Sequence, residues 1–170
     1  MSSIRFSILS AALSVFVVAS ANAAPSSKYA DATAKRAAAA TPMSVAALEA
    51  LYSGRTWKWK DGGGYFSADR HRFTGWSEKG AAWFYGKGRW KASYGGKLCM
   101  QAVWFYRTGY GNASTCFLHR EKDGVIYQKP ALGGEWYVFR HNPVRAGDEI
   151  RKLVPGDRVG KDISRLQAEQ

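Results

Sequence analysis

The chain has 170 residues, and 25 Lys and Arg residues against 13 Asp and Glu residues give it a formal net charge of +12. This length suits one domain, and the 46% hydrophobic and 14% aromatic content argues against a disordered chain. Two cysteines are too few for a disulfide-dense scaffold. The composition therefore predicts a basic, aromatic-rich globular domain.

Residues 1–23 have the pattern of a secretory signal peptide. Arg5 supplies the positive n-region, an apolar run from Ile8 to Val18 follows, and Ala21-Asn22-Ala23 provides the small residues of a cleavage site. The run is shorter than the about 20 residues that a membrane-spanning helix needs, and no later segment approaches that length. We therefore expect a mature protein that is periplasmic or secreted and has no transmembrane segment.

The next segment predicts a leader and a helix. Residues 24–41 are rich in Ala, Ser and Lys, which is typical of a flexible leader. Thr41 and Pro42 resemble an N-cap followed by proline at the first helical position. Apolar side chains at helical spacing follow, and Gly54 offers a stop, so a short helix is expected before Gly54.

From Arg55 onward, apolar and polar residues alternate with the period of two that is typical of strands. Glycine-rich turn signals separate the runs at intervals of roughly ten residues. After the run with Trp57 and Trp59, the expected strands are Tyr65-Phe66, Arg70–Trp76, Ala81–Tyr94, Leu98–Tyr106, Ala113–Arg120, Val125–Lys129 and Glu135–Arg140. We predict an all-β fold over residues 42–141, an antiparallel meander or small barrel of seven to eight strands preceded by one short helix. The charged segment 142–170 is expected to be a loosely docked tail or a short covering helix.

Alternation also assigns side chains to the two faces. The aromatic residues expected in the core or around an internal cavity are Trp57, Trp59, Trp90, Trp104 and Trp136. Gly62–Gly64, Gly86 and Gly88 are interpreted as turn and bulge glycines. Trp83 and Tyr85 share the parity of the lysines on the same run, so either they are exposed or the two later glycines form a bulge.

Cys99 and Cys116 lie in neighbouring strand-like runs on either side of a glycine-containing turn. In an oxidising compartment two cysteines permit one pairing, so we expect a disulfide that joins adjacent antiparallel strands. A bridge that closes a loop of this size is worth about 3 kcal/mol in chain entropy. A redox or metal-binding pair would need a C-x-x-C spacing or further ligands, and the sequence near the cysteines has neither.

Several motifs of the predicted β region resemble those of one bacterial family. They are Leu51-Tyr-Ser-Gly-Arg-Thr-Trp-Lys-Trp, Gly88-Arg-Trp90, Leu98-Cys99, Thr115-Cys116-Phe117-Leu118-His119-Arg120 and Trp136-Tyr-Val-Phe-Arg-His141. In this order, over about residues 45–141, they resemble the alphaproteobacterial domain-of-unknown-function family 995. The resemblance implies a small periplasmic or secreted protein of a Gram-negative bacterium, and it implies no particular activity, substrate or catalytic residue.

A looser likeness to lipocalin-type barrels rests on a glycine close to a tryptophan in the first strand after a short helix. The lipocalin pattern places one residue between the two, whereas two residues separate Gly54 from Trp57 here. The likeness nevertheless keeps open a carrier that holds a small apolar ligand inside its barrel.

The chain lacks the common catalytic and metal-binding motifs. No H-x-x-x-H, H-E-x-x-H or G-x-S-x-G pattern is present, so no metal, cofactor or serine nucleophile is expected. His71, His119 and His141 are the only histidines, and each lies next to an arginine, a setting that suits a base or an anion-binding site. A strand histidine with local hydrogen bonds is the plainer interpretation. No catalytic residue is assigned, and a hydrolase that uses His119 stays an alternative.

Basic residues interleaved with aromatic residues are the remaining signal. This pattern is typical of proteins that bind single-stranded nucleic acid, but export removes that partner, so no nucleic acid is expected. An exported basic surface would instead meet lipopolysaccharide, peptidoglycan or acidic polysaccharide. The candidate anion-binding surface comprises Arg70, Arg72, Lys87, Arg89, His119 and Arg120. The predicted function is a non-catalytic, envelope-associated binding protein for an anionic component, against a merely solvated basic exterior.

Overall fold

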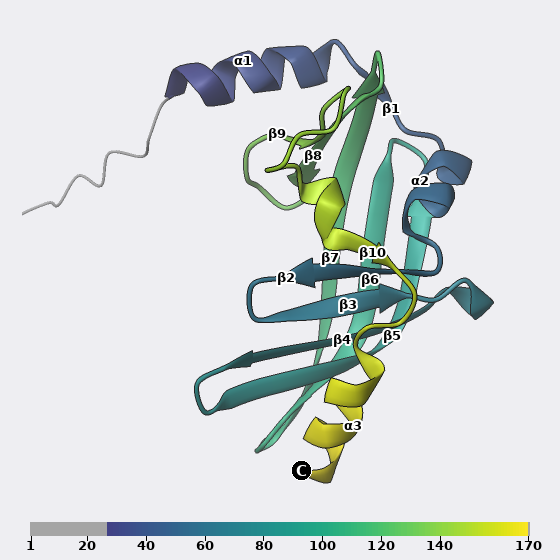
Figure 1. Cartoon of the computed structure of the whole chain (residues 1–170), viewed down its shortest axis with the longest axis vertical. Helices are drawn as coiled ribbons and strands as arrows, with labels where there is room; N and C mark the ends of the chain where they lie inside the picture. Colours follow the sequence, from purple (N-terminus) through teal and green to yellow (C-terminus); the bar gives the residue numbers. More distant parts are fainter. Residues whose placement is uncertain (1–26, 170) are drawn as a thin grey trace, which may run out of the picture.

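The computed structural model describes residues 27–169, so the predicted signal peptide lies outside the described residues. Over this range the chain forms one antiparallel sheet that curls into a half-barrel (Figure 1). Its ten described strands follow the order β10-β2-β3-β4-β5-β6-β7-β8-β9, with β1 paired to β7. Successive strands from β2 to β9 are neighbours, which is the predicted meander.

Ten strands and three α-helices make up the described part of the chain. The strands are β1 (Thr41–Pro42), β2 (Arg55–Trp59), β3 (Gly62–Phe66), β4 (Arg72–Lys79), β5 (Ala82–Ser93), β6 (Lys97–Tyr106), β7 (Gly109–Lys122), β8 (Val125–Pro130), β9 (Tyr137–Arg140) and β10 (Leu153–Pro155). The helices are α1 (Ser27–Ala38), α2 (Val45–Tyr52) and α3 (Gly160–Ala168), with 3₁₀ helices η1 (Asp69–His71) and η2 (Glu149–Lys152). The predicted all-β class is confirmed, and the strands beyond the expected number are the very short β1 and β10.

The segment before the meander has more regular structure than the sequence predicts. Residues 27–38, expected within a flexible leader, form α1, and the end of this helix packs on the outer face of the sheet. Thr41 and Pro42 do not begin the next helix, because their extended backbone pairs with β7. Ser44 is the N-cap of α2 instead, and its hydroxyl oxygen accepts a hydrogen bond from the Ala47 N–H over 3.1 Å.

The glycines inside the strands continue the ladder instead of breaking it. Gly62–Gly64, expected in a turn, form β3 and pair with both β2 and β4. Gly86 and Gly88 pair in unbroken register with β4 and β6, so this part of the described sheet has no bulge. Trp83 and Tyr85 therefore stay on the outer face of β5, where α3 covers and buries them. Neither exposure nor a bulge, the two expected alternatives, is found.

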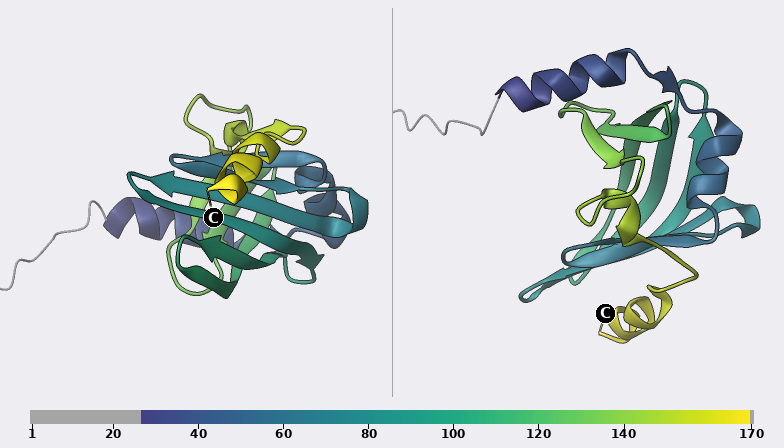
Figure 2. Two further views of the ribbon diagram at one scale, coloured as in Figure 1. Left: turned by 90° about the horizontal axis from the view of Figure 1, so that it is seen from below. Right: turned by 45° about the horizontal axis from the view of Figure 1, so that its top comes forward.

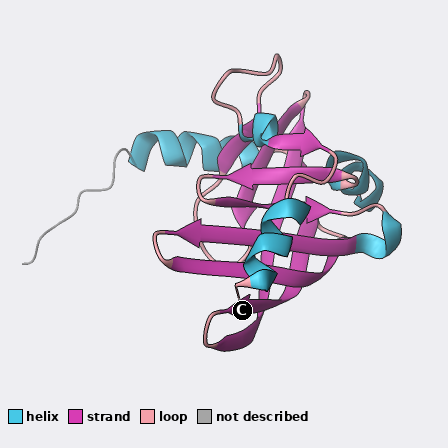
Figure 3. Cartoon of the chain, turned by 60° about the horizontal axis from the view of Figure 1, so that its bottom comes forward, coloured by secondary structure: helices cyan, strands magenta, loops and turns pink. Residues whose placement is uncertain are grey.

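Helices cover parts of both faces of the curled sheet. In Figure 2, α2 lies against one end of the concave side, where it buries Leu48, Leu51 and Tyr52 in the main core. Figure 3 shows α3 lying across the outer face, where it buries Ile163 and Leu166. In residues 27–169, no helix is long and apolar enough to cross a membrane.

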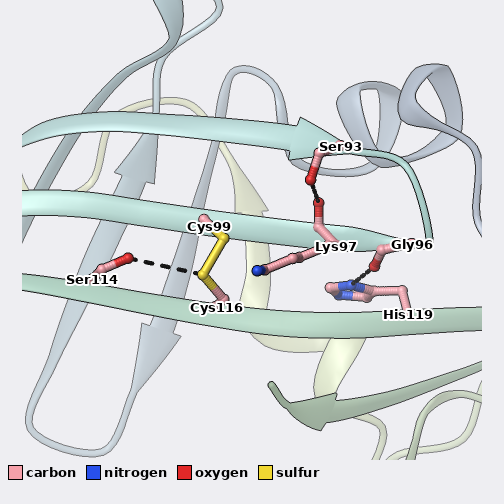
Figure 4. The surroundings of a disulfide bond; sticks show 7 residues. All are labelled: Ser93, Gly96, Lys97, Cys99, Ser114, Cys116 and His119. Carbon is pink, nitrogen blue, oxygen red and sulfur yellow. Dashed lines mark hydrogen bonds between the residues drawn. A yellow bond between two sulfur atoms is a disulfide. The ribbon is translucent and has the colours of Figure 1, made fainter. Parts of the chain in front are cut away.

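The two cysteines face each other directly across β6 and β7. Their sulfur atoms lie 2.10 Å apart, so the structure contains the predicted disulfide (Figure 4). Since Cys99 alternates with the buried Leu98 and Met100, the bridge lies on the outer face of the sheet. The bridge therefore joins the two strands from the outside of the half-barrel.

Candidate functional site

A row of three glycines crosses the concave face of the half-barrel. Pairing places Gly64 of β3, Gly75 of β4 and Gly86 of β5 side by side. The row ends on Trp57 in β2 and on Trp104 in β6, which pair with the two outer glycines. At this level three adjacent strands present bare backbone, and an indole side chain flanks them on each side.

Aromatic rings lie directly on this glycine row. A Cβ atom added at Gly64 would come within 2.7 Å of the Phe73 ring, and one added at Gly86 would come within 2.8 Å of the Trp104 ring. At Gly75 an added Cβ would meet both rings at 3.2 Å. Glycine inside a strand is typical of such close approach, because a larger residue would push the ring away.

The rings line a half-open cavity of about 320 Å³ on the concave face. Its lining residues are Trp57, Trp59, Phe73, Met100, Trp104, Thr115, Phe117 and Glu149. Among the described residues that line it, five are aromatic and Glu149 alone carries a formal charge. The volume falls within the range of roughly 300–1,000 Å³ that small-molecule sites occupy. The cavity therefore has the size and the apolar character of a ligand site, with one carboxylate in its wall.

Glu149 reaches the cavity from η2, in the connection between β9 and β10. The Trp57 Nε1–H donates a hydrogen bond of 2.9 Å to Glu149 Oε1. Lys152 Nζ lies 2.7 Å from Oε2, and its side chain is 54% exposed against 23% for that of Glu149. The carboxylate is thus oriented by an indole and neutralised from the solvent side. The sequence gives no sign of this role, because Glu149 lies in a segment with the charge pattern of a solvated tail.

The five tryptophans predicted for the core or a cavity divide among three places. Trp57, Trp59 and Trp104 line the cavity. Trp90 is buried in the main core, where its indole N–H is bonded to a backbone carbonyl over 2.9 Å. Trp136 precedes β9 and is partly buried against a small apolar cluster beside α1, apart from the main core and the cavity.

A buried polar network lies beside the aromatic core. His119 Nδ1 is the donor to Gly96 O over 3.2 Å, because a carbonyl oxygen can only accept (Figure 4). Its Nε2 is then the acceptor, with Tyr52 OH at 2.8 Å and Gln128 Nε2 at 2.6 Å. Gln128 also donates to Tyr52 OH and accepts from Tyr137 OH. Four side chains from α2, β7, β8 and β9 are thereby tied together.

Burial keeps this network uncharged. It lowers the pKa of His119 from 6.5 to about 4, an effect that the hydrogen bond to Gly96 offsets only in part. Burial also raises the pKa of Tyr52 and of Tyr137, and the charge of Glu149 adds to both shifts. No group of three or more His, Cys, Asp or Glu in residues 27–169 could hold a metal ion. The network is therefore a neutral connection between strands β7, β8 and β9 and helix α2.

Two of the predicted anion-binding residues do not join that surface. His119 and Arg120 are adjacent in β7, and successive side chains of a strand point to opposite faces. His119 points inward and is fully buried, so it reaches neither solvent nor the cavity. Arg120 donates to the carbonyls of Ala37 and Ala38 over 3.1 and 3.0 Å, which satisfies the C-terminal end of α1. The prediction is corrected for both residues.

The other predicted basic residues gather on the outer face of β4 and β5. Arg72 lies directly opposite Arg89, and Lys87 follows two positions away on the same strand as Arg89. Arg70 lies beside them in η1 with a backbone φ of 50°, in the left-handed region that non-glycine residues rarely adopt. Arg70, Arg89 and Lys91 line a depression of about 480 Å³, and its lining also includes His71 and the carboxylate of Glu49 from α2.

The fold and the site place this chain in the class of antiparallel half-barrels that have an aromatic cavity on the concave face. Residues 14–159 match the family described as "Protein of unknown function (DUF995)". The match covers most of the chain, so the chain belongs to this family, and the resemblance of its motifs is confirmed. No curated protein and no solved structure matched the chain, and the likeness to lipocalin-type barrels is not shown.

Proposed function

We propose that this protein is a non-catalytic binding protein that holds a small apolar ligand in its concave cavity. The observation that carries the proposal is the aromatic lining over the glycine row. Removing apolar surface from water against such rings is favourable by about 25 cal/mol per Å². Because the rings already pack against a paired sheet, a ligand would lose little of its binding free energy to ordering the site.

The polar groups of the cavity support binding over catalysis. General base and nucleophilic catalysis both need a base within hydrogen-bond reach of the reacting group. Glu149 is the one charged group among the described lining residues, and both of its oxygens already have partners, Trp57 and Lys152. Its arrangement suits the recognition of a ligand rather than proton transfer.

The neutral apolar dye N-phenyl-1-naphthylamine tests this proposal, because its fluorescence rises in apolar surroundings. Thr115 and Ser114 are adjacent exposed residues of β7, and Thr115 lines the cavity while Ser114 points to the outer face. Thr115→Trp should fill the cavity and weaken dye binding about tenfold, whereas the matched control Ser114→Trp should keep the affinity within about twofold. A protein that does not bind the dye, or two variants with equal affinity, would contradict the proposal.

A second candidate function is binding of an anionic envelope component such as lipopolysaccharide, peptidoglycan or acidic polysaccharide. The depression favours it, because Arg70, Arg89 and Lys91 outnumber the one carboxylate in its lining, that of Glu49. Like charges directly opposite in a sheet, as in the Arg72 and Arg89 pair, are destabilising. Asp69 already pairs with Arg72 over 2.6 Å, so a bound anion would act mainly on Arg89. Backbone strain of the kind found at Arg70 is also concentrated at functional sites.

Co-sedimentation of the mature chain with each envelope fraction tests the second candidate at low and high salt. Arg89→Glu should remove most of the pelleting at low salt, and high salt should do the same to the wild type. Lys161→Glu makes an equal change of charge at an exposed position of α3, away from the depression. Equal losses in the two variants would show that net charge alone drives the association and would reject this site.

A further inference from the structure

We infer that the ligand of the concave cavity is a cation, a quaternary or protonated amine attached to a small apolar body. The inference rests on the proposed function, because it names the chemistry of the ligand in the same cavity. Three features carry it: the charge of Glu149, the faces of the surrounding rings and the few hydrogen-bonding groups in the lining.

The charge at the cavity is opposite in sign to that of the whole chain. The net charge is +12, yet Glu149 alone among the described lining residues carries a formal charge, and it is negative. With its side chain 23% exposed, the carboxylate acts through a lower effective dielectric than bulk water, which strengthens its attraction for a cation. The carboxylate would repel an anionic ligand, and a neutral ligand would gain no charge–charge attraction from it.

Aromatic rings from four strands, β2, β4, β6 and β7, line the cavity that such a cation would enter. Trp57 and Phe117 have centroids 5.0 Å apart and an interplanar angle of 61°, and Phe73 and Trp104 are 6.4 Å apart at 62°. In neither pair do the rings stack face to face. Trp57 and Phe73 are buried, whereas Trp59, Trp104 and Phe117 are partly exposed, so these three rings are the ones that a cation can reach. Aromatic faces carry the negative part of the quadrupole, and they attract cations within about 6 Å of the centroid, with Trp the strongest.

The present partner of Glu149 is easily exchanged. Lys152 approaches from the solvent side with a half-exposed side chain, so water would solvate its ammonium group after a ligand displaces it. The Trp57 N–H would continue to hold Oε1 while a ligand replaces the lysine at Oε2. Besides the indole N–H groups, the Thr115 hydroxyl is the other neutral polar side-chain group in the described lining. A quaternary ammonium has no N–H to satisfy, so this lining suits it.

Three probes of similar shape and different charge distinguish the contribution of ligand charge to the affinity from that of apolar burial. Phenyltrimethylammonium, tert-butylbenzene and benzenesulfonate have nearly the same size and are cationic, neutral and anionic, respectively. Tryptophan fluorescence reports their binding to the full mature chain, because three tryptophans line the cavity. We expect the cation to bind about tenfold or more tightly than the neutral probe, and the anion to bind weakest.

Variants of residues at the cavity test whether the preference for the cationic probe arises there. Glu149→Gln should weaken binding of the ammonium probe about tenfold and leave tert-butylbenzene within about twofold, and Lys152→Gln should strengthen binding of the ammonium probe. Glu135→Gln, at an exposed glutamate before β9, is the matched control and should change neither. Thr115→Trp should weaken binding of all the probes that bind, and ammonium binding that resists it would overturn the inference by placing the cation elsewhere.

The outcomes distinguish this inference from the proposed function. The inference of a cationic ligand is wrong if tert-butylbenzene or benzenesulfonate binds as tightly as the ammonium probe. It is also wrong if Glu149→Gln leaves the preference for the ammonium probe unchanged. In both cases the proposed apolar ligand site is not contradicted. If only N-phenyl-1-naphthylamine binds, the inference fails in the same way. If neither the dye nor any of the three probes binds, the proposed function fails together with the inference.

Discussion

Trp57 and Trp104 stand at the two ends of one cross-strand row, and every position between them is glycine. The two indoles come from β2 and β6, so three whole strands separate them in the sheet. Since no side chain rises from the three intervening glycines, Phe73 and Trp104 can lie down on the backbone between the ends of the row. The cavity is thus a consequence of where the glycines fall in register.

Enlarging a residue of this row should cost stability. Gly86→Ala places a Cβ atom 2.8 Å from the Trp104 ring, which is closer than van der Waals contact. We therefore expect the free energy of unfolding to fall by about 1–3 kcal/mol. Gly111 is the matched control, because it pairs with Trp104 on the other side and an added Cβ there meets nothing within 4 Å. Urea unfolding of both variants measures the difference, and equal losses would contradict a role of ring packing.

Much of the sheet could be predicted from local patterns. The period of two residues located β4 to β9 because strands that are half buried alternate in polarity over their whole length. The disulfide followed from simple counting, since two cysteines on neighbouring runs allow one partner each. Both inferences need only information that lies along the chain.

The cavity could not be predicted in the same way, because it depends on register between strands. Gly75 and Gly86 have a purpose only when they lie side by side, and each alone has the pattern of a turn or bulge. Glu149 joins the site from a segment far along the chain, through a hydrogen bond to Trp57. One error was avoidable: His119 and Arg120 are adjacent in a strand, so they could not share one surface.

The disulfide should contribute substantially to stability. Cys99 and Cys116 are 17 residues apart, so replacing both with serine should lower the free energy of unfolding by about 3 kcal/mol through the added entropy of the unfolded chain. Denaturant unfolding of the oxidised wild type and of the double variant measures the loss. Wild-type protein with a reductant is the control and should match the double variant, whereas equal stability with and without the bridge would contradict the prediction.

The packing of α3 on the outer face of the sheet should also contribute to stability. Leu166 of α3 is fully buried in the cluster with Trp83 and Tyr85, so Leu166→Ala should lower the free energy of unfolding by about 2–5 kcal/mol. The adjacent Gln167 is exposed, and Gln167→Ala should change it by less than about 0.5 kcal/mol. Thermal or urea unfolding measures both. Similar values for the two variants would mean that α3 does not hold to the sheet in solution.

The buried imidazole makes stability depend on pH in a defined window. The pKa of His119 is about 4 in the folded protein against an ordinary 6.5, so between these values the unfolded chain binds a proton that the folded chain does not. The stabilisation is complete above about pH 6.5 and should fall by up to about 3 kcal/mol as the pH drops to about 4. Urea unfolding in half-unit steps of pH measures this slope.

Two histidine variants test whether His119 causes this dependence of stability on pH. His119→Gln removes the ionisation, so it should flatten the fall between pH 6.5 and 4 while lowering stability near neutral pH, because it disturbs the bonds to Tyr52 and Gln128. His71→Gln, at an exposed histidine, should keep the wild-type slope.

Asp148 should not produce a slope in the same pH window. Burial acts to raise the pKa of this carboxyl, but hydrogen bonds from Arg145 and His141 outweigh it and lower the pKa below 3.8, so its contribution to stability is lost only at more acidic pH. A wild-type slope in His119→Gln would therefore remove the buried imidazole as the cause.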